Sequence, residues 1–92
     1  VRAHKLLYLR ESYRKRVQRE AQSSDILNII DYLFSNPFIT VKRAQHILDV
    51  TYPTGKKYVE KLVEYEILKE TNRLQREKTF VAYEIYEIIK DI

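Results

Sequence analysis

The hydrophobic positions of the first twenty residues follow a helical repeat. Nothing from about Ala3 to Gln22 breaks a helix, and apolar side chains recur at every third or fourth position, at Leu6, Leu9, Tyr13 and Val17. Arginine and lysine fill many of the other positions. The pattern predicts a long amphipathic helix whose apolar stripe has to pack against something.

The next stretch predicts the central helix of the core. Ser23 or Ser24 offers an N-cap, and Asp25 stands where a negative charge favours a helix start. The apolar side chains that follow are Ile26, Leu27, Ile29, Ile30, Leu33 and Phe34. Pro37 disfavours helical geometry in the residue before it, so the helix is expected to end by that point.

A short extended piece at Phe38 and Ile39 precedes the next helix. Thr40 is a good N-cap for this helix, whose inward positions are Val41, Ala44, Ile47 and Leu48. Its other side is polar, with Lys42, Arg43, Gln45 and His46. Asp49 and Val50 are expected to form the turn that follows.

A third capped helix begins after that turn. Thr51 is its N-cap, and Pro53 stands in the first turn, where a missing N–H costs nothing. Its inner face is expected to consist of Gly55, Val59, Leu62 and Val63. Gly55 is the only glycine in the chain, and we expect it to mark a close crossing of two helices.

The hydrophobic period changes after Glu66. Residues 67–71 and 78–83 predict two strands joined by residues 72–77, and a last helix is expected from about 84 to 91. The fold class that follows is mostly α with a small antiparallel β-hairpin, a winged helix-turn-helix preceded by a long amphipathic helix. Residues 1–22 are expected to form the basic helix, and residues 23–92 the winged helix-turn-helix domain.

The net charge of +4 is concentrated in the first helix. Residues 1–20 carry seven basic and two acidic side chains, whereas the remainder carries ten basic and eleven acidic ones. The expected winged helix is therefore close to neutral. This weakens a DNA-binding interpretation, because phosphate binding draws on local positive charge.

Composition argues against several classes of site. The chain has no cysteine, which excludes disulfides and Cys-based zinc sites. His4 and His46 are far apart and lack companion ligands, so no metal and no cofactor is expected. The carboxylates are spread over solvent positions, with no pair suited to acid–base chemistry. No stretch resembles a membrane span or a secretory signal, so we expect a cytoplasmic protein with no membrane partner.

Four segments together resemble a known family. Residues 8–17, 30–41, 50–63 and 84–89, in this order, are similar to the C-terminal winged-helix region of bacterial Fic-family proteins. The pieces include the Asn36-Pro37 pair before Thr40 and the Thr51-Tyr-Pro-Thr turn, and their combination in this order is more telling than any one piece, because such a turn also occurs in many winged-helix repressors. One departure is Tyr65-Glu66, where the family has Leu-Gly before the first wing strand. A residue other than glycine there requires a strained or adjusted turn.

The resemblance implies a non-catalytic accessory module of a protein adenylyltransferase. Full-length members of the family move AMP from ATP to a protein hydroxyl, and they need a His-Pro-Phe motif followed by Gly-Asn-Gly-Arg. Neither motif is present here, so no catalytic residue is carried over and this chain is not expected to be an enzyme. The implied role is a regulatory protein–protein contact or dimerisation, with an upstream Fic catalytic domain or a second copy as partner.

The alternative function is the DNA-binding domain of a transcription regulator. It would present the helix at residues 51–64 and the wing at residues 72–78 to double-stranded DNA, with candidate contacts at Tyr52, Thr54, Lys56, Lys57, Lys61, Arg73, Arg76 and Lys78. A solvated face that also carries Glu60 and Glu64, and a charged hairpin tip that keeps a sheet edge soluble, explain the same residues without DNA. Both interpretations stay open.

The first helix has three interpretations. It could bind nucleic acid or an acidic membrane surface. It could pair with a second copy through an interface at Leu6, Leu9, Tyr13 and Val17. It could also be the last helix of a missing upstream domain, as the resemblance favours, and loss of that domain would leave the stripe free to dimerise.

Overall fold

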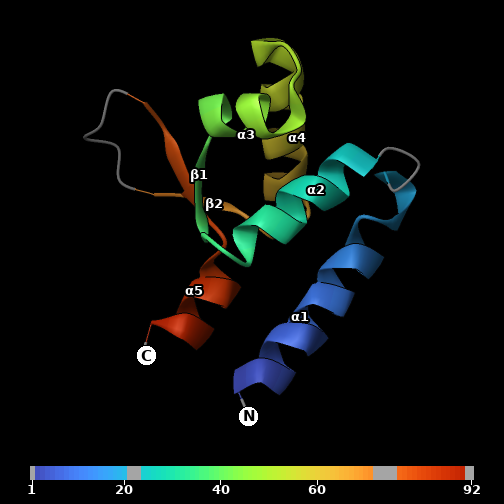
Figure 1. Ribbon diagram of the computed structural model, residues 1–92, viewed down its shortest axis with the longest axis vertical. Helices are drawn as coiled ribbons and strands as arrows, with labels where there is room; N and C mark the ends of the chain where they lie inside the picture. Colours follow the sequence, from blue (N-terminus) through green and yellow to red (C-terminus); the bar gives the residue numbers. More distant parts are fainter. Residues whose placement is uncertain (1, 21–23, 72–76, 91–92) are drawn as a thin grey trace.

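The computed structural model describes residues 2–20, 24–71 and 77–90. Its elements, in chain order, are α1 (Arg2–Arg16), a 3₁₀ turn (Gln18–Glu20), α2 (Ser24–Leu33), β1 (Phe38–Thr40), α3 (Val41–Leu48), α4 (Tyr52–Glu64), β2 (Lys69–Glu70), β3 (Thr79–Val81) and α5 (Tyr83–Ile89). The predicted fold class, a mostly helical winged helix-turn-helix with a small antiparallel sheet, is confirmed. Helices α3 and α4 lie at one end of the molecule, and the start of α1 and the end of α5 lie at the other (Figure 1).

The first helix is shorter than the sequence pattern predicts. It ends at Arg16 and passes into a single 3₁₀ turn, although no helix breaker stands between there and residue 20. Val17 is fully buried in the core, and its N–H still donates to the Tyr13 carbonyl, so the chain leaves the helical path only after this residue. The other predicted elements agree with the observed ones to within a few residues.

The apolar stripe of α1 packs inside this chain. Leu9, Tyr13 and Val17 belong to the hydrophobic core, and Leu6 is partly buried against it. Helix α1 contacts both α2 and α5. The expectation that this stripe is free for a second copy therefore needs correction, because a dimer through these side chains would require α1 to leave the core.

Helix α2 is the centre of the core, as its sequence predicts. Ile26, Ile29, Ile30 and Leu33 are all fully buried. They share the interior with Val59 and Leu62 of α4 and Ile85 of α5. The helical elements thus enclose one core, and burial of this apolar surface supplies the main driving force for the fold.

Helices α3 and α4 begin at the predicted caps. The Thr40 hydroxyl accepts a hydrogen bond from the Arg43 N–H, and the Thr51 hydroxyl accepts one from the Thr54 N–H. Between the helices, Asp49 adopts a left-handed conformation with φ 56°. Aspartate tolerates this region better than most residues, so the tight turn needs no glycine.

The two helices cross closely at Gly55. A Cβ added to Gly55 would lie 3.1 Å from the Gln45 backbone nitrogen and 3.2 Å from its Cα. Because these are backbone atoms of α3, the obstacle could not simply rotate away. The predicted reason for the only glycine is confirmed, and it fixes how α4 lies against α3.

The three strands form one antiparallel sheet in the order β1-β3-β2. Thr40 pairs with Thr79 and Ile39 with Phe80, while Lys69 pairs with Val81 from the other side. The central strand β3 thereby ties the hairpin to the segment that leads directly into α3. Residues 72–76, which contain most of the predicted wing tip, lie outside the described residues.

Helix α4 ends in a left-handed turn at Glu66, which has φ 62°. The Glu66 N–H donates to the Val63 carbonyl and the Ile67 N–H to the Leu62 carbonyl, both at 2.9 Å, which is the hydrogen-bond pattern of a Schellman motif. The adjusted turn predicted at Tyr65-Glu66 is thus present. Val63, predicted to face inward, is 38% exposed, so that assignment was wrong.

We expect Gly55→Ala to lower the free energy of unfolding by about 1 kcal/mol. Overpacking against the Gln45 backbone costs roughly 1–3 kcal/mol, which exceeds the gain of about 1 kcal/mol in helix propensity. Urea unfolding followed by circular dichroism measures the change. Lys57→Ala at an exposed position of the same helix is the control and should be nearly neutral. A stabilised Gly55→Ala variant would show that the helices have room to separate.

We expect Glu66→Gly to raise the free energy of unfolding, in contrast to Gly55→Ala. A non-glycine residue in the left-handed region costs roughly 1–2 kcal/mol, and glycine avoids this strain. About half of that gain is cancelled, because glycine has a larger conformational entropy in the unfolded chain. The variant should therefore be more stable by about 0.5–1 kcal/mol in thermal unfolding. Glu60→Gly, at an exposed position in the interior of the same helix, should instead lose about 1 kcal/mol. Equal effects of the two substitutions would contradict the assignment of the turn.

Candidate nucleic-acid interface

An open groove runs between α4 and the strand β3 and encloses about 610 Å³. Its floor is apolar and comes from three elements: Val41 of α3, Val59 of α4 and Phe80 of β3. All three side chains are buried in the core, so the floor is continuous with the interior of the protein.

The rim of the groove carries mixed charge. Lys42, Lys56 and Lys78 contribute three ammonium groups, and Glu60 and Glu77 contribute two carboxylates. All five residues are exposed to solvent. The rim therefore has a small excess of positive charge. It attracts a polyanion only at places where the lysines outnumber the carboxylates.

One face of α4 points into this groove. It is formed by Tyr52, Lys56 and Glu60, spaced four residues apart and hence stacked along the helix. Tyr52 is 49% exposed although it is a large aromatic side chain. Along the helix, a ligand in the groove would therefore meet an aromatic, then a cationic and then an anionic side chain.

The structure separates the predicted contact residues into three groups. Tyr52, Lys56 and Lys78 line the groove, and Lys57 is exposed beside them with its ammonium 5.5 Å from the centre of the Tyr58 ring. Thr54 and Lys61 are engaged elsewhere: the Thr51 and Thr54 hydroxyls lie 3.0 Å apart in the helix cap, and Lys61 lies 4.0 Å from the Glu64 carboxylate. Arg73 and Arg76 lie outside the described residues.

The candidate contacts predicted from the sequence include neither Lys42 nor Glu77. Both line the groove because Thr40 pairs with Thr79, which sets the first turn of α3 beside the start of β3. This register is a long-range feature, so no local signal in the sequence could have revealed it.

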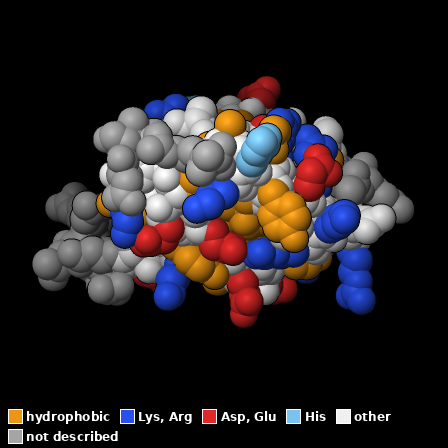
Figure 2. Space-filling view, turned by 90° about the horizontal axis from the view of Figure 1, so that it is seen from below, with side chains coloured by type: hydrophobic (Ala, Val, Ile, Leu, Met, Phe, Trp, Pro, Cys, Tyr) orange, Lys and Arg blue, Asp and Glu red, His pale blue; other side chains and the backbone are white. Residues whose placement is uncertain are grey.

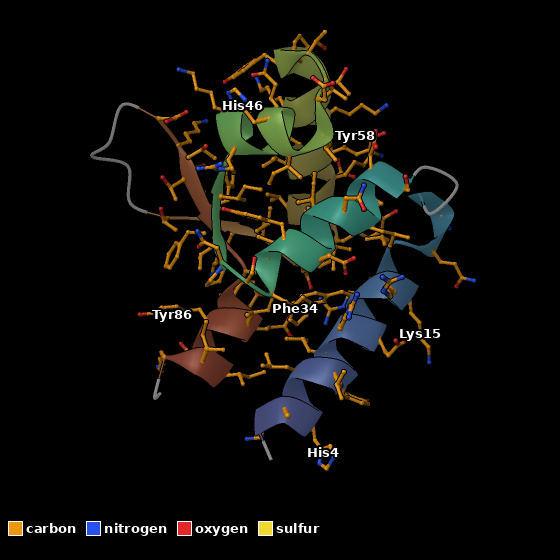
Figure 3. The ribbon with its side chains drawn as sticks, viewed as in Figure 1. His4, Lys15, Phe34, His46, Tyr58 and Tyr86 are labelled. Carbon is orange, nitrogen blue, oxygen red and sulfur yellow. The ribbon has the colours of Figure 1, made fainter. Side chains whose placement is uncertain are left out.

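Part of the basic character of α1 is neutralised within the fold. Arg10 lies 2.9 Å from the Asp31 carboxylate of α2, and Arg14 lies 3.5 Å from the same oxygen. Lys15, by contrast, points away from the body of the protein (Figure 3). Several of the charges that made this helix look like a binding surface therefore hold it in place.

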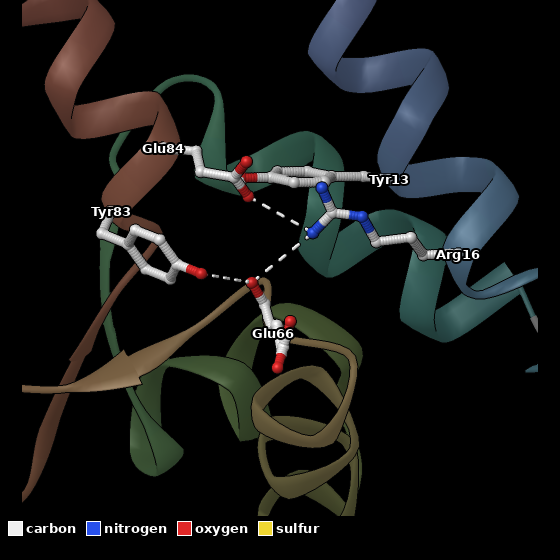
Figure 4. Close-up of polar contacts among 5 residues, drawn as sticks. All are labelled: Tyr13, Arg16, Glu66, Tyr83 and Glu84. Atoms are coloured by element: carbon white, nitrogen blue, oxygen red, sulfur yellow. Dashed lines mark hydrogen bonds and ion pairs between the residues drawn. The ribbon is translucent and has the colours of Figure 1, made fainter.

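A cluster of polar contacts joins α1, α5 and the end of α4 (Figure 4). The Tyr13 hydroxyl donates to Glu84 Oε1 at 3.2 Å, and Arg16 donates to the same oxygen at 3.3 Å. Arg16 also donates to the Glu66 carbonyl at 3.5 Å, and the Tyr83 hydroxyl donates to that carbonyl at 3.1 Å. The left-handed turn that ends α4 is thus connected to both flanking helices.

Burial raises the pKa of the Tyr13 phenol above its ordinary value. The negative charge of Glu84 and the hydrogen bond to it raise this pKa further, whereas the Arg16 guanidinium acts in the opposite direction. The phenol therefore stays neutral at physiological pH and acts as a hydrogen-bond donor. Its role is to hold α1 against α5, not to transfer protons.

The described residues contain no group of three or more metal-binding side chains. His4 and His46 lie at opposite ends of the protein (Figure 3). No helix in the described part of the chain is long and apolar enough to cross a membrane.

The end of the molecule away from α3 and α4 has a different surface. Figure 2 views this end and shows apolar side chains interleaved with basic and acidic ones. Exposed apolar residues of α1 and of the β1 and α5 region are Leu7, Tyr8, Phe38 and Tyr86. Phe38 and Tyr86 pack edge to face with ring centres 5.5 Å apart, so part of this surface is already paired within the chain.

No protein-family model matches the sequence, and no curated protein matches it. Among solved structures the chain is similar to a MarR family transcriptional regulator from Silicibacter pomeroyi DSS, with a TM-score of 0.58 and 18% sequence identity. The match covers 97% of this chain and 66% of the length of that structure. The fold is a winged helix. At this identity the comparison shows the fold alone.

The expected resemblance to Fic-family proteins is wrong by these comparisons. The solved structure described above is that of a transcriptional regulator, and nothing found points to a Fic protein. The motifs that suggested the family, a capped helix pair with Thr51 and Pro53 at its turn, are those of the winged helix-turn-helix itself. The implied adenylyltransferase parent and its catalytic domain as partner are without support.

We expect Tyr13→Phe to lower the free energy of unfolding at neutral pH by about 1 kcal/mol, through loss of the hydrogen bond to Glu84. Because folding raises the pKa of Tyr13, the contribution of this phenol is complete below its ordinary pKa of about 10 and is lost as pH rises above that value. The difference between the two proteins should therefore narrow above about pH 10.

Urea unfolding of both proteins between pH 7 and pH 11 measures this dependence. Tyr8→Phe is the matched control, since Tyr8 is 80% exposed on the same helix and should show no such difference. A gap between wild type and Tyr13→Phe that stays constant with pH would contradict the assigned role.

Proposed function

We propose that this chain is a DNA-binding domain that presents α4 to the major groove of a duplex, with the β2–β3 hairpin alongside as the wing. The observation that carries the proposal is the open groove between α4 and β3, with Lys42, Lys56 and Lys78 on its rim. Cations on three separate elements converge on one surface, which is the arrangement that a phosphate backbone requires.

The geometry of α4 supports this function. The helix runs from Tyr52 to Glu64, is capped at Thr51 and is fixed against α3 at Gly55. Its outer face carries no part of the core and is free to meet a ligand. A helix with its side chains is roughly 10–12 Å across, which matches the roughly 12 Å width of the major groove of B-DNA.

The structural likeness is consistent with this proposal. The similar protein is described as a transcriptional regulator, and the shared fold extends over nearly the whole of this chain. The small positive excess of the rim predicts moderate, salt-dependent affinity instead of very tight binding. We infer no catalytic activity, because the groove is open and its two carboxylates, Glu60 and Glu77, are exposed to solvent.

The basic helix α1 is the less favoured surface for DNA. Arg10, Arg14 and Arg16 are held in ion pairs with Asp31 and Glu84, so fewer of its cations are available to phosphates. Lys5 and Lys15 remain exposed on this helix. They provide a direct comparison with the lysines of the groove.

We expect Lys56→Glu combined with Lys78→Glu to weaken binding to random-sequence duplex DNA by roughly tenfold or more. The slope of log affinity against log salt should fall in magnitude by about 2, because each of the two lysines would neutralise one phosphate. Fluorescence anisotropy at low and at physiological salt measures both quantities.

The control is Lys5→Glu combined with Lys15→Glu, which changes the net charge by the same amount on α1. It should leave most of the binding intact. Equal loss of affinity in the two double variants would mean that only total charge matters. Greater loss in the α1 variant, or no binding of the wild-type chain at low salt, would contradict the proposed function.

A further inference from the structure

Glu60 occupies an unusual place for an acidic residue in a DNA-binding surface. It lines the groove one helical turn after Lys56, on the same face of α4. It is exposed, and within the described part of the chain it makes no hydrogen bond or ion pair. Its carboxylate is therefore available to a ligand.

A carboxylate so placed is unfavourable beside phosphates. Two like charges repel, and the groove already has Glu77 on its opposite side, so Glu60 reduces the attraction that the lysines supply. The contribution becomes favourable only where the ligand offers a hydrogen-bond donor. Among the groups on the base edges of the major groove, the cytosine N4 amino group is the donor with which glutamate is typically paired.

The spacing of Lys56 and Glu60 fits such a contact. Four residues advance a helix by roughly 6 Å, and neighbouring base pairs are roughly 3.4 Å apart, so the two side chains reach positions about two base pairs apart. Lys56 can then donate to a phosphate or to a guanine while Glu60 faces a different base.

We propose that Glu60 is a specificity-determining residue, which selects a cytosine in the major groove by accepting a hydrogen bond from its amino group. This inference rests on the proposed function and adds a base preference to it. Glu60 repels phosphates at every sequence and offsets that repulsion only where a base donates to it, most favourably at a cytosine. Glu60 therefore lowers the affinity for duplexes without the preferred base more than the affinity for duplexes that carry it.

Glu64 provides a matched control. It stands one turn further along α4, its side chain is 69% exposed, and it lies 4.0 Å from the Lys61 ammonium. Glu64 does not line the groove. Replacing Glu60 or Glu64 with glutamine removes the same charge from the same helix, but only the first change removes the proposed acceptor from the groove.

The test is selection of bound sequences from a library of randomised duplexes by the whole chain, as wild type, Glu60→Gln and Glu64→Gln. Wild type and Glu64→Gln should both enrich one cytosine. Glu60→Gln should lose it or exchange it for adenine, which the glutamine amide pairs with through N6 and N7. In anisotropy, replacing that C·G pair should cost wild type roughly 5- to 150-fold in affinity, and the Glu60→Gln variant far less.

Each other outcome is informative. A uniform gain in affinity for Glu60→Gln, with unchanged sequence preference, would overturn the inference and leave Glu60 as a general repulsive charge. The same shift of preference in Glu64→Gln would also overturn it. Absence of binding by wild type to any duplex would overturn the proposed function together with this inference. Thermal unfolding of each variant, expected to be unchanged because both residues are exposed, confirms that the fold is intact.

Discussion

The close crossing of α3 and α4 determines how the helix that borders the groove is placed. It is possible because residue 55 has no side chain. The backbone of α4 approaches Gln45 so closely that even a methyl group at this position would be crowded. The two threonine caps fix where each helix begins, and the Schellman motif at Glu66 fixes where α4 ends. With its start, crossing point and end all determined, α4 presents a defined outer face to solvent.

Strand pairing converts this exposed helix into a site. The register of β1 with β3 brings the hairpin back beside the first turn of α3, and the groove forms where the two meet α4. On the other side, Tyr13, Arg16 and Tyr83 connect the flanking helices to Glu84 and to the Glu66 carbonyl at the end of α4. Helices α1 and α5 thus support the end of α4 through these contacts.

Local features of this fold could be predicted from the sequence, and long-range ones could not. The two helix caps and the close crossing were predicted correctly from Thr40, Thr51 and Gly55. The threonines act within a few residues of themselves, and Gly55 acts through the absence of a side chain. The burial of the α1 stripe within this chain was missed, since it depends on packing against α2 and α5. The groove was only partly predicted, because Lys42 and Glu77 come to line it through the long-range pairing of β1 with β3. The family resemblance failed because its motifs belong to a widespread fold.

The proposed DNA-binding surface is best tested by titrating the ¹⁵N-labelled chain with a short DNA duplex and following the amide chemical shifts by NMR. We expect the largest changes in the first turns of α4, at Lys42 and around Lys78, all of which border the groove. Amides of α1 and α5 should change little. Changes centred on α1, or none in α4 under conditions where DNA is bound, would contradict the central claim that the groove between α4 and β3 is the DNA-binding surface.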